Sequence, residues 1–263
     1  EFIAGEGKLV RGGGRVVKNV AGFDLVRLIT GSWGTLGVIS EVTLRLYSTS
    51  SQPVTLALNL PVGTGGVAQR IAAILNGPAT PFAVEMLDSA TAAQIGLPGK
   101  TQVLVRIGGN AAAVQAQRDA LGKLGGAHEV PPEVWGQLRL IEGAGTMKDE
   151  PPVVIRLSTL PGHVAELWTA VQGTMERIAG AMMHATPSLG IVRCILPASA
   201  VDCSACHALA ASIGGVTTVY ERLPSVMWTE LSPSVTSDRL SRSVKHAFDP
   251  GNILNPGILG NLT

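Results

Sequence analysis

The chain has 263 residues, of which 46% are hydrophobic, so it can bury a large core in one domain or in two smaller ones. Its formal net charge is +1, and Lys and Arg do not gather into a basic stripe, which argues against a nucleic-acid-binding protein. No stretch of about eighteen consecutive apolar residues is present, so the sequence predicts no transmembrane helix. The chain opens at Glu1 in the middle of a pattern, and we interpret it as a fragment or a processed piece.

The first expected elements are short. Phe2–Gly14 alternates weakly in polarity around Gly5-Glu6-Gly7, which is typical of two short strands joined by a turn. Asp24–Thr30 carries apolar residues at helical spacing, and Gly31 follows where the C-terminus of a helix favours positive φ. The sequence therefore predicts a strand pair and then a short helix.

A strand and a linker are expected next. Val38–Leu46 alternates in polarity, which predicts a half-buried strand whose apolar face carries Val42, Leu44 and Leu46. Tyr47–Pro53 contains four Ser or Thr residues and a proline, so it is the expected linker.

Beyond the linker, strands and helices alternate. The expected strands are Val54–Leu60, Phe82–Leu87, Gln102–Ile107, Val153–Leu160, two near Met182 and Ile191, and Val216–Glu221. The expected helices are Gly65–Leu75, Ala111–Leu124, His163–Ile178, Ala200–Ile213 and Ser234–Phe248. This order predicts an α+β fold, in which two loosely repeated units form one antiparallel sheet covered on one face by helices.

Two phrases stand out within this pattern. Residues 16–39 read VVKNVAGFDLVRLITGSWGTLGVI, and they combine a cationic turn, a short helix and three glycines spaced by three, Gly31, Gly34 and Gly37. Glycine lets a backbone adopt positive φ and lets a ligand or a second backbone approach closely. Residues 248–257 read FDPGNILNPG, and a weaker third phrase joins Trp135 to Leu138-Arg139.

These phrases, in this order, resemble those of the FAD-linked oxidases of the vanillyl-alcohol-oxidase type. Within that group they are most similar to the E-type FAD-binding subunit of bacterial glycolate oxidase, also called glycolate dehydrogenase. The resemblance implies that 1–47 is the C-terminal part of the FAD-binding domain and that 54–233 is the cap or substrate domain. It implies that 234–263 returns to the FAD domain. In the family a larger N-terminal flavin lobe precedes the first phrase, and nothing in the sequence corresponds to it.

The resemblance also implies a function. The expected cofactor is FAD, and the expected activity is an oxidoreductase acting on CH–OH groups, as a subunit that assists oxidation of glycolate to glyoxylate. The implied partners are a catalytic flavin subunit, an iron–sulfur subunit and a small 2-hydroxy acid, but no nucleic acid. The implied location is cytoplasmic, with peripheral contact to the inner membrane through the complex.

The resemblance implies cofactor-binding residues as well, namely Lys18, Asn19, Gly31, Gly34, Thr35, Gly37, Val38, Ile39 and Asn255. The backbone at the start of the predicted strand can hydrogen-bond the adenine edge without any side chain, whereas the Asn is expected near the flavin ring. Taken alone, Lys18 and Asn19 fit a solvated turn, the glycines fit tight helix-to-strand packing, and Asn255-Pro256-Gly257 fits a tight turn after a helix.

Residues 203–207, CSACH, match the spacing of a haem c attachment site. They also lie on an expected amphipathic helix with Val201, Leu209 and Ile213, where haem would displace core packing. Three interpretations therefore stand: haem attachment, a redox or structural thiol pair, and plain buried cysteines.

The family's catalytic subunits carry a His-x-Gly-Asp-Gly-Asn phrase, whose histidine can take the hydroxyl proton or bind a metal. None of the five histidines here is followed by Gly-Asp-Gly, and no metal-ligand cluster can be assigned. Catalytic residues are thus not assigned. Two alternatives remain beside the accessory subunit: a free-standing 2-hydroxy-acid dehydrogenase of the D-lactate type, with an acid and a base such as Arg193, Glu221 or Arg222, and a scaffold that has lost the cofactor.

Overall fold

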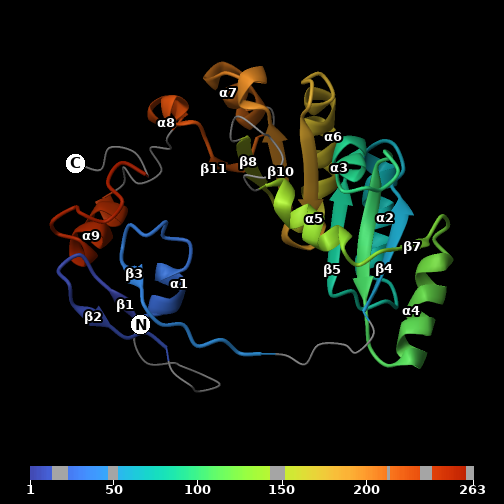
Figure 1. The fold of residues 1–263 in the computed structure, drawn as a ribbon, viewed down its shortest axis with the longest axis horizontal. Coiled ribbons are helices and arrows are strands. Elements are labelled where there is room, and N and C mark those ends of the chain that lie inside the picture. Colours follow the sequence, from blue (N-terminus) through green and yellow to red (C-terminus); the bar gives the residue numbers. More distant parts are fainter. Residues whose placement is uncertain (14–22, 47–52, 143–151, 212–213, 232–238, 259–263) are drawn as a thin grey trace. The chain divides into compact units, whose positions relative to one another are not determined.

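The computed structural model describes the chain except for residues 14–22, 47–52, 143–151, 212–213, 232–238 and 259–263 (Figure 1). It divides into two compact units. Unit 1 consists of Glu1–Ser48 and Ser232–Thr263, and unit 2 of Thr49–Leu231. Lys18, Asn19 and most of the predicted linker lie outside the described residues.

Unit 1 contains a small antiparallel sheet. Among its described residues the strand order is β2-β1-β3, with bounds Leu9–Val10, Phe2–Ile3 and Val38–Ile39. The turn between β1 and β2 is closed by the N–H of Ala4, which donates to the carbonyl oxygen of Lys8, and Gly7 in this turn has φ +76°. The predicted strand pair with its glycine turn is confirmed.

Two helices flank this sheet, α1 (Leu25–Ile29) and α9 (Arg239–Phe248). Asp24 caps α1 by accepting a hydrogen bond from the N–H of Arg27, and Gly31 follows the helix with φ +78°, as predicted. The core of unit 1 is built from Phe2, Ile29 and Leu36, against which α9 packs Val244 and Phe248. Helix α9, which is more than 200 residues from Phe2 in the sequence, thus completes the core of unit 1.

The predicted half-buried strand Val38–Leu46 is wrong beyond its first two residues. Only Val38–Ile39 pairs with another strand, and the side chains of Val42, Leu44 and Leu46 are 63%, 72% and 84% exposed. The described part of unit 1 supplies no strand or helix to cover these three side chains.

Unit 2 is built on one antiparallel sheet. Over the described residues its strand order is β11-β8-β10-β9-β5-β6-β4-β7. The bounds, in the same order, are Thr217–Arg222, Val153–Ser158, Ile191–Leu196, Met182–Thr186, Ala83–Leu87, Gln102–Ile107, Val54–Asn59 and His128–Val130. The strands of the first repeat, β4 to β7, form one half of the sheet, and those of the second, β8 to β11, form the other half. The two halves meet where β5 pairs with β9, so the prediction that two repeated units share one sheet is confirmed.

The longer helices cover one face of this sheet. They are α2 (Thr64–Leu75), α4 (Ala111–Gly122), α6 (Val164–Met175) and α7 (Cys203–Ala211), and α8 (Ser225–Leu231) packs against α7. The core beneath them is apolar throughout, and Trp168 of α6 is fully buried in it. These helices match the predicted ones except α8, which was not predicted.

Two short helices pack on the opposite face, and neither was predicted. They are α3 (Ser89–Gln94) and α5 (Val134–Ile141), which form a second apolar cluster with Leu87, Leu104 and Ile195 of the sheet. In the described residues, 3₁₀ turns at Pro161–His163, Pro187–Leu189 and Ala198–Ala200 connect other elements. In the described parts of both units, no helix combines the length and the apolar character needed to cross a bilayer.

Candidate functional site

A pocket of about 460 Å³ opens in unit 1 between two loops that are distant in sequence. One wall is the glycine loop, residues 31–39, and the other is the C-terminal loop, residues 253–255. The residues that line the pocket are Ile29, Gly31, Ser32, Trp33, Gly34, Gly37, Val38, Ile39, Ile253, Leu254 and Asn255. The structure thus brings the two outer phrases of the sequence to one place.

A side-chain hydrogen bond joins the two walls. Asn255 Nδ2 donates to the carbonyl oxygen of Trp33 over 2.7 Å, although the two residues are 222 positions apart. Trp33 and Gly34 are the central residues of a tight turn, in which the N–H of Thr35 donates to the carbonyl oxygen of Ser32. Both central residues have positive φ, +56° and +68°, which is the pattern of a type I′ turn.

Backbone strain is concentrated beside this pocket. Among the described residues, the non-glycine residues with positive φ are Trp33 (+56°), Asn252 (+49°) and Asn255 (+42°). All three lie in the two loops or next to them. Such conformations cost on the order of 1–3 kcal/mol each and cluster at functional sites, so their position makes this pocket a functional candidate.

The three glycines of the loop have different roles. Gly31 has positive φ, and a Cβ added there would meet no atom within 4 Å, so this glycine provides the left-handed backbone that follows α1. A side chain on Gly37 would come within 2.5 Å of the Phe2 ring, so this glycine allows close packing on β1. A side chain on Gly34 would come within 2.8 Å of Asn255 Nδ2, so here the absent Cβ admits the second wall.

Of the site residues predicted from the sequence, Gly31, Gly34, Gly37, Val38, Ile39 and Asn255 lie together around the pocket. Thr35 lies next to it but is buried, and its hydroxyl donates to the carbonyl oxygen of Ser32 over 2.7 Å. That Lys18 and Asn19 bind a cofactor stays a prediction, because they fall outside the described residues. Trp33, Ile253 and Leu254 were not predicted, although they adjoin predicted residues.

Replacing Gly34 with alanine is expected to destabilise unit 1 and to separate the pocket walls. Alanine at φ +68° costs about 1–2 kcal/mol of backbone strain, and its Cβ pushes the Asn255 amide away from Trp33. Gly31→Ala is the matched control, since Gly31 has φ +78° but no atom within 4 Å of the added Cβ. Urea unfolding of both variants measures the difference, and we expect Gly34→Ala to cost about 1 kcal/mol more, the worth of one hydrogen bond. Equal losses would contradict a role for the Asn255 contact.

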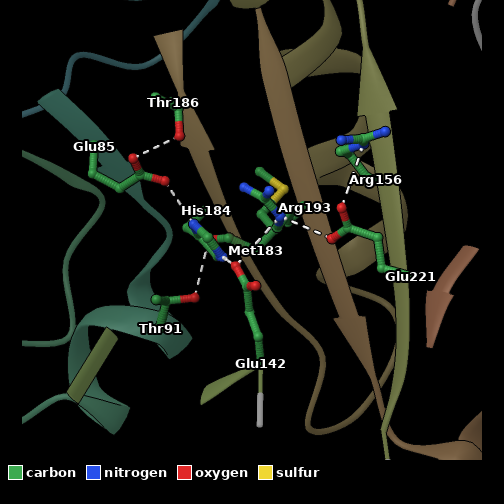
Figure 2. Close-up of polar contacts among 9 residues, drawn as sticks. All are labelled: Glu85, Thr91, Glu142, Arg156, Met183, His184, Thr186, Arg193 and Glu221. Atoms are coloured by element: carbon green, nitrogen blue, oxygen red, sulfur yellow. Dashed lines mark hydrogen bonds and ion pairs between the residues drawn. The ribbon is translucent and has the colours of Figure 1, made fainter. Parts of the chain in front are cut away.

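A second candidate is a cluster of charged side chains in unit 2 (Figure 2). At its centre, His184 of β9 is buried between two carboxylates: Nδ1 lies 2.6 Å from Glu85 Oε1, and Nε2 lies 2.7 Å from Glu142 Oε1. Glu85 also accepts a hydrogen bond from Thr186 Oγ1 over 2.8 Å. Burial alone would lower the pKa of His184, but Glu142 and Glu85 outweigh it and raise the pKa to about 9. The imidazole is therefore cationic at neutral pH.

The cluster continues across the sheet through two arginines. Arg193 of β10 lies opposite His184 and Arg156 in the strand register, and its Nε contacts Glu221 Oε2 at 2.9 Å and Glu142 Oε1 at 3.4 Å. Arg156 Nε lies 3.4 Å from Glu221 Oε1. Burial by itself lowers the pKa of Arg193, but Glu142 and Glu221 raise it above its ordinary value, so Arg193 stays protonated.

This arrangement is suited to holding the sheet together rather than to moving protons or binding a metal. The cationic His184 cannot accept a proton near neutral pH, and the protonated Arg193 cannot serve as the base that the dehydrogenase alternative would require. The two carboxylates approach opposite ring nitrogens of His184, so one ion could not be bound by all three groups. Nor do the other described residues form a group of three or more His, Cys, Asp or Glu suited to a metal.

The CSACH phrase forms the first five residues of α7. Cys206 is fully buried in the core of unit 2, Cys203 is partly exposed and His207 is exposed, and both cysteines are free thiols. Burial, Cys203 and Asp202 raise the pKa of Cys206 to about 11, so little of it is thiolate near neutral pH. The packing of Cys206 favours the interpretation as a buried cysteine over a reactive one.

Curated relatives cover parts of this chain, whereas no protein-family profile matches it. Glycolate oxidase subunit GlcD of Bacillus subtilis is 34% identical over 113 residues, which are 41% of this chain and 24% of the relative. Glycolate oxidase subunit GlcE of Escherichia coli is 32% identical over 138 residues, which are 52% of this chain and 34% of the relative. D-lactate dehydrogenase of Archaeoglobus fulgidus is 26% identical over 98% of this chain and 62% of the relative. The chain therefore spans less than two thirds of the length of each of these relatives.

A solved structure shares the fold over nearly the whole chain. P-cresol methylhydroxylase with substrate bound superposes with a TM-score of 0.66 at 13% identity, covering 99% of this chain and 64% of that one. Alkyldihydroxyacetonephosphate synthase superposes with a TM-score of 0.52 at 18% identity, over 91% of this chain and 50% of that one. The chain is therefore similar in sequence to glycolate oxidase subunits and to a D-lactate dehydrogenase, and it shares its fold with p-cresol methylhydroxylase and alkyldihydroxyacetonephosphate synthase.

Proposed function

We propose that this protein is an FAD-binding subunit of a complex that oxidises glycolate, or a closely similar 2-hydroxy acid, to the 2-oxo acid. The pocket of unit 1 is the proposed contact with the cofactor, and the residues around it are the six predicted ones, Gly31, Gly34, Gly37, Val38, Ile39 and Asn255. The similarity to glycolate oxidase subunits and to a D-lactate dehydrogenase supports the substrate class. When bound, FAD supplies the acceptor for the hydride that leaves the hydroxyl-bearing carbon.

The observation that carries the proposal is the junction of the glycine loop with Asn255. Its lining is mainly apolar, with Ser32 and Asn255 as the polar residues, and Trp33 is 38% and Ile39 53% exposed, which suits a planar ring better than a charged group. Within the described sheet β3 is an edge strand, so the outward N–H and C=O groups of Val38–Ile39 can pair with the edge of a heteroaromatic ring. The residues present therefore fit part of a flavin nucleotide.

The two compact units support the assignment of the chain to two domains. We assign 1–47 and 234–263 to the FAD-binding domain and 54–233 to the cap domain. Unit 1 joins the first and last segments in one core, as this assignment requires. The charged cluster then belongs to the cap domain, where its ion pairs link β5, β9, β10, β8 and β11.

Flavin binding by the protein as its gene encodes it tests this function. We expect the purified protein to show the two visible flavin absorption bands, and the flavin-free protein to rebind added FAD in a fluorescence titration. Asn255→Ala should weaken this binding, because it removes the hydrogen bond between the pocket walls. A protein without flavin bands that leaves the fluorescence of added FAD unchanged would favour the scaffold alternative instead.

Anaerobic reduction separates the accessory subunit from a free-standing dehydrogenase. We expect the bound flavin to remain oxidised when the isolated protein receives glycolate or D-lactate, and to be reduced once the catalytic flavin subunit and the iron–sulfur subunit are added. Reduction of the isolated protein by either acid would instead support the free-standing enzyme. Copurification with those subunits, in the cytoplasmic fraction or peripherally on inner membranes, tests the proposed partners and location.

A further inference from the structure

Lys245 of α9 is a buried cation that touches three separate segments of unit 1. Its side chain is 10% exposed, and its Nζ donates to Asp249 Oδ2 over 2.6 Å. The same Nζ donates to the carbonyl oxygen of Thr35 over 2.9 Å and to the carbonyl oxygen of Leu254 over 2.9 Å. These contacts use all three N–H groups of the ammonium, so one side chain joins the glycine loop, the helix and the C-terminal loop.

Asp249 is the second half of this arrangement, and its side chain is fully buried. Beside the ion pair with Lys245, it accepts hydrogen bonds from the N–H of Ile253 (Oδ1, 3.1 Å) and from the N–H of Leu254 (Oδ2, 2.8 Å). Burial alone raises the pKa of Asp249, but Lys245 and these two N–H groups hold it below its ordinary value. The carboxylate thereby fixes the loop that leads from α9 to Asn255.

The pair is placed to set the spacing of the pocket walls. Thr35 directly follows Gly34 in the glycine loop, and Ile253 and Leu254 line the opposite wall. Several apolar residues of the walls are themselves exposed, including Val38 at 56% and Ile253 at 66%, so their packing cannot hold the loops together. A buried ion pair seldom adds net stability over apolar side chains of the same size, which favours a role in geometry over one in stability alone.

We propose that Lys245 and Asp249 are positioning residues for the cofactor pocket, holding the glycine loop and the C-terminal loop at the separation that FAD requires. Neither side chain is among the residues that line the pocket, so both would act through the loops that they hold. The inference rests on the proposed function, because it takes FAD to be the ligand of this pocket. The sequence pattern behind it is a lysine in the last turn of α9, four residues before the aspartate of the closing phrase, which directly follows the helix.

Titration of the flavin-free protein with FAD tests the proposal. We expect Lys245→Met and Asp249→Asn to raise the Kd for FAD at least tenfold. Arg242→Met, which removes an exposed cation from the same helix, should stay within twofold of the unchanged protein. If the unchanged protein binds no FAD, the proposed function fails; if it binds FAD and both variants bind it equally well, only this inference is overturned.

A second measurement covers variants that fail to fold. Far-UV circular dichroism and the thermal midpoint are recorded on each flavin-free sample, and affinity is compared only among folded proteins. In the unchanged protein, amide hydrogen exchange at Ile253 and Leu254 reports directly on the bonds to Asp249. We expect saturating FAD to slow both amides at least tenfold while amides of β6 in unit 2 stay unchanged. Exchange rates at Ile253 and Leu254 that do not change when FAD is added would overturn the proposal.

Discussion

Replacing His184 with glutamine is expected to lower the free energy of unfolding of unit 2 by about 3–5 kcal/mol at pH 7. His184 is the cation between Glu85 and Glu142, and the side chains of His184 and Glu85 are only 5% and 10% exposed. Glutamine preserves much of the volume but leaves Glu85 buried without its counter-charge. The variant should recover part of its stability below about pH 5, where carboxylates begin to protonate.

The same cluster makes the unchanged protein sensitive to alkaline pH. The pKa of His184 is raised to about 9 in the fold, above the value of about 6.5 expected for the unfolded chain. Its stabilisation is therefore complete below about pH 6.5 and is lost as the pH rises through 9, an effect on the order of 3 kcal/mol. Urea unfolding between pH 6 and pH 10 measures this loss, and His184→Gln should remove this part of the pH dependence.

His163→Gln provides the matched control. His163 also contacts a glutamate, with Nδ1 3.0 Å from Glu166 Oε2, but both side chains are more than half exposed. An exposed pair of this kind contributes at most about 1 kcal/mol, so this variant should unfold close to the unchanged protein at every pH. A comparable loss of unfolding free energy in His184→Gln and His163→Gln would show that the burial of His184 does not determine the size of the effect.

The second large effect is expected at Gly190, in the connection between β9 and β10. Its φ is +67°, and a Cβ there would come within 2.1 Å of the backbone oxygen of Thr159 and 3.0 Å of the backbone of Leu160 and Pro161. The N–H of Thr159 also donates to the carbonyl oxygen of Gly190 over 2.9 Å. Backbone cannot rotate away as a side chain can, so we expect Gly190→Ala to cost more than about 3 kcal/mol, well above an ordinary substitution.

Gly125→Ala is the control that separates the cost of backbone strain from the cost of steric crowding at Gly190. Gly125 follows α4 with φ +80°, but no atom lies within 4 Å of the added Cβ. This variant should therefore lose only the left-handed strain, about 1–2 kcal/mol. Thermal or urea unfolding of the two variants gives the difference directly. A Gly190→Ala protein as stable as Gly125→Ala would mean that the end of β8 moves aside without cost.

The sequence allowed most of the sheet of unit 2 to be predicted, because its strands are continuous apolar or alternating runs between clear breaks. Gln102–Ile107 was predicted with the observed bounds, and Val54–Leu60 was one residue too long. The short helix α3 was missed, although Asp88 caps it by accepting from the N–H of Thr91, a signal that the sequence does contain. Helix α5 carries a glycine at its third position, and its eight residues gave too little periodicity to separate it from a loop.

The candidate sites were predictable to different degrees. The glycine loop and Asn255 could be paired because both phrases resemble the pattern of one family, whereas short-range sequence rules do not predict a contact between such distant residues. The cluster around His184 could not be assembled in the same way, since Glu85 lies 99 positions before it and Glu142 follows an unpredicted helix. The sequence did contain one signal for this cluster, which is the charged Glu85 inside the apolar run of β5, because a buried carboxylate needs a partner.

The 222 positions between Trp33 and Asn255 have a consequence for how the protein is made. A ribosome adding about 5–20 residues per second exposes the glycine loop roughly ten to forty-five seconds before Asn255 is even synthesised. Unit 2 is synthesised during that interval and ends at Leu231, whereas α9, which is made later, is not yet available to cover Phe2 and Ile29. The pocket between the glycine loop and Asn255 therefore forms late in synthesis, after α9 has left the exit tunnel.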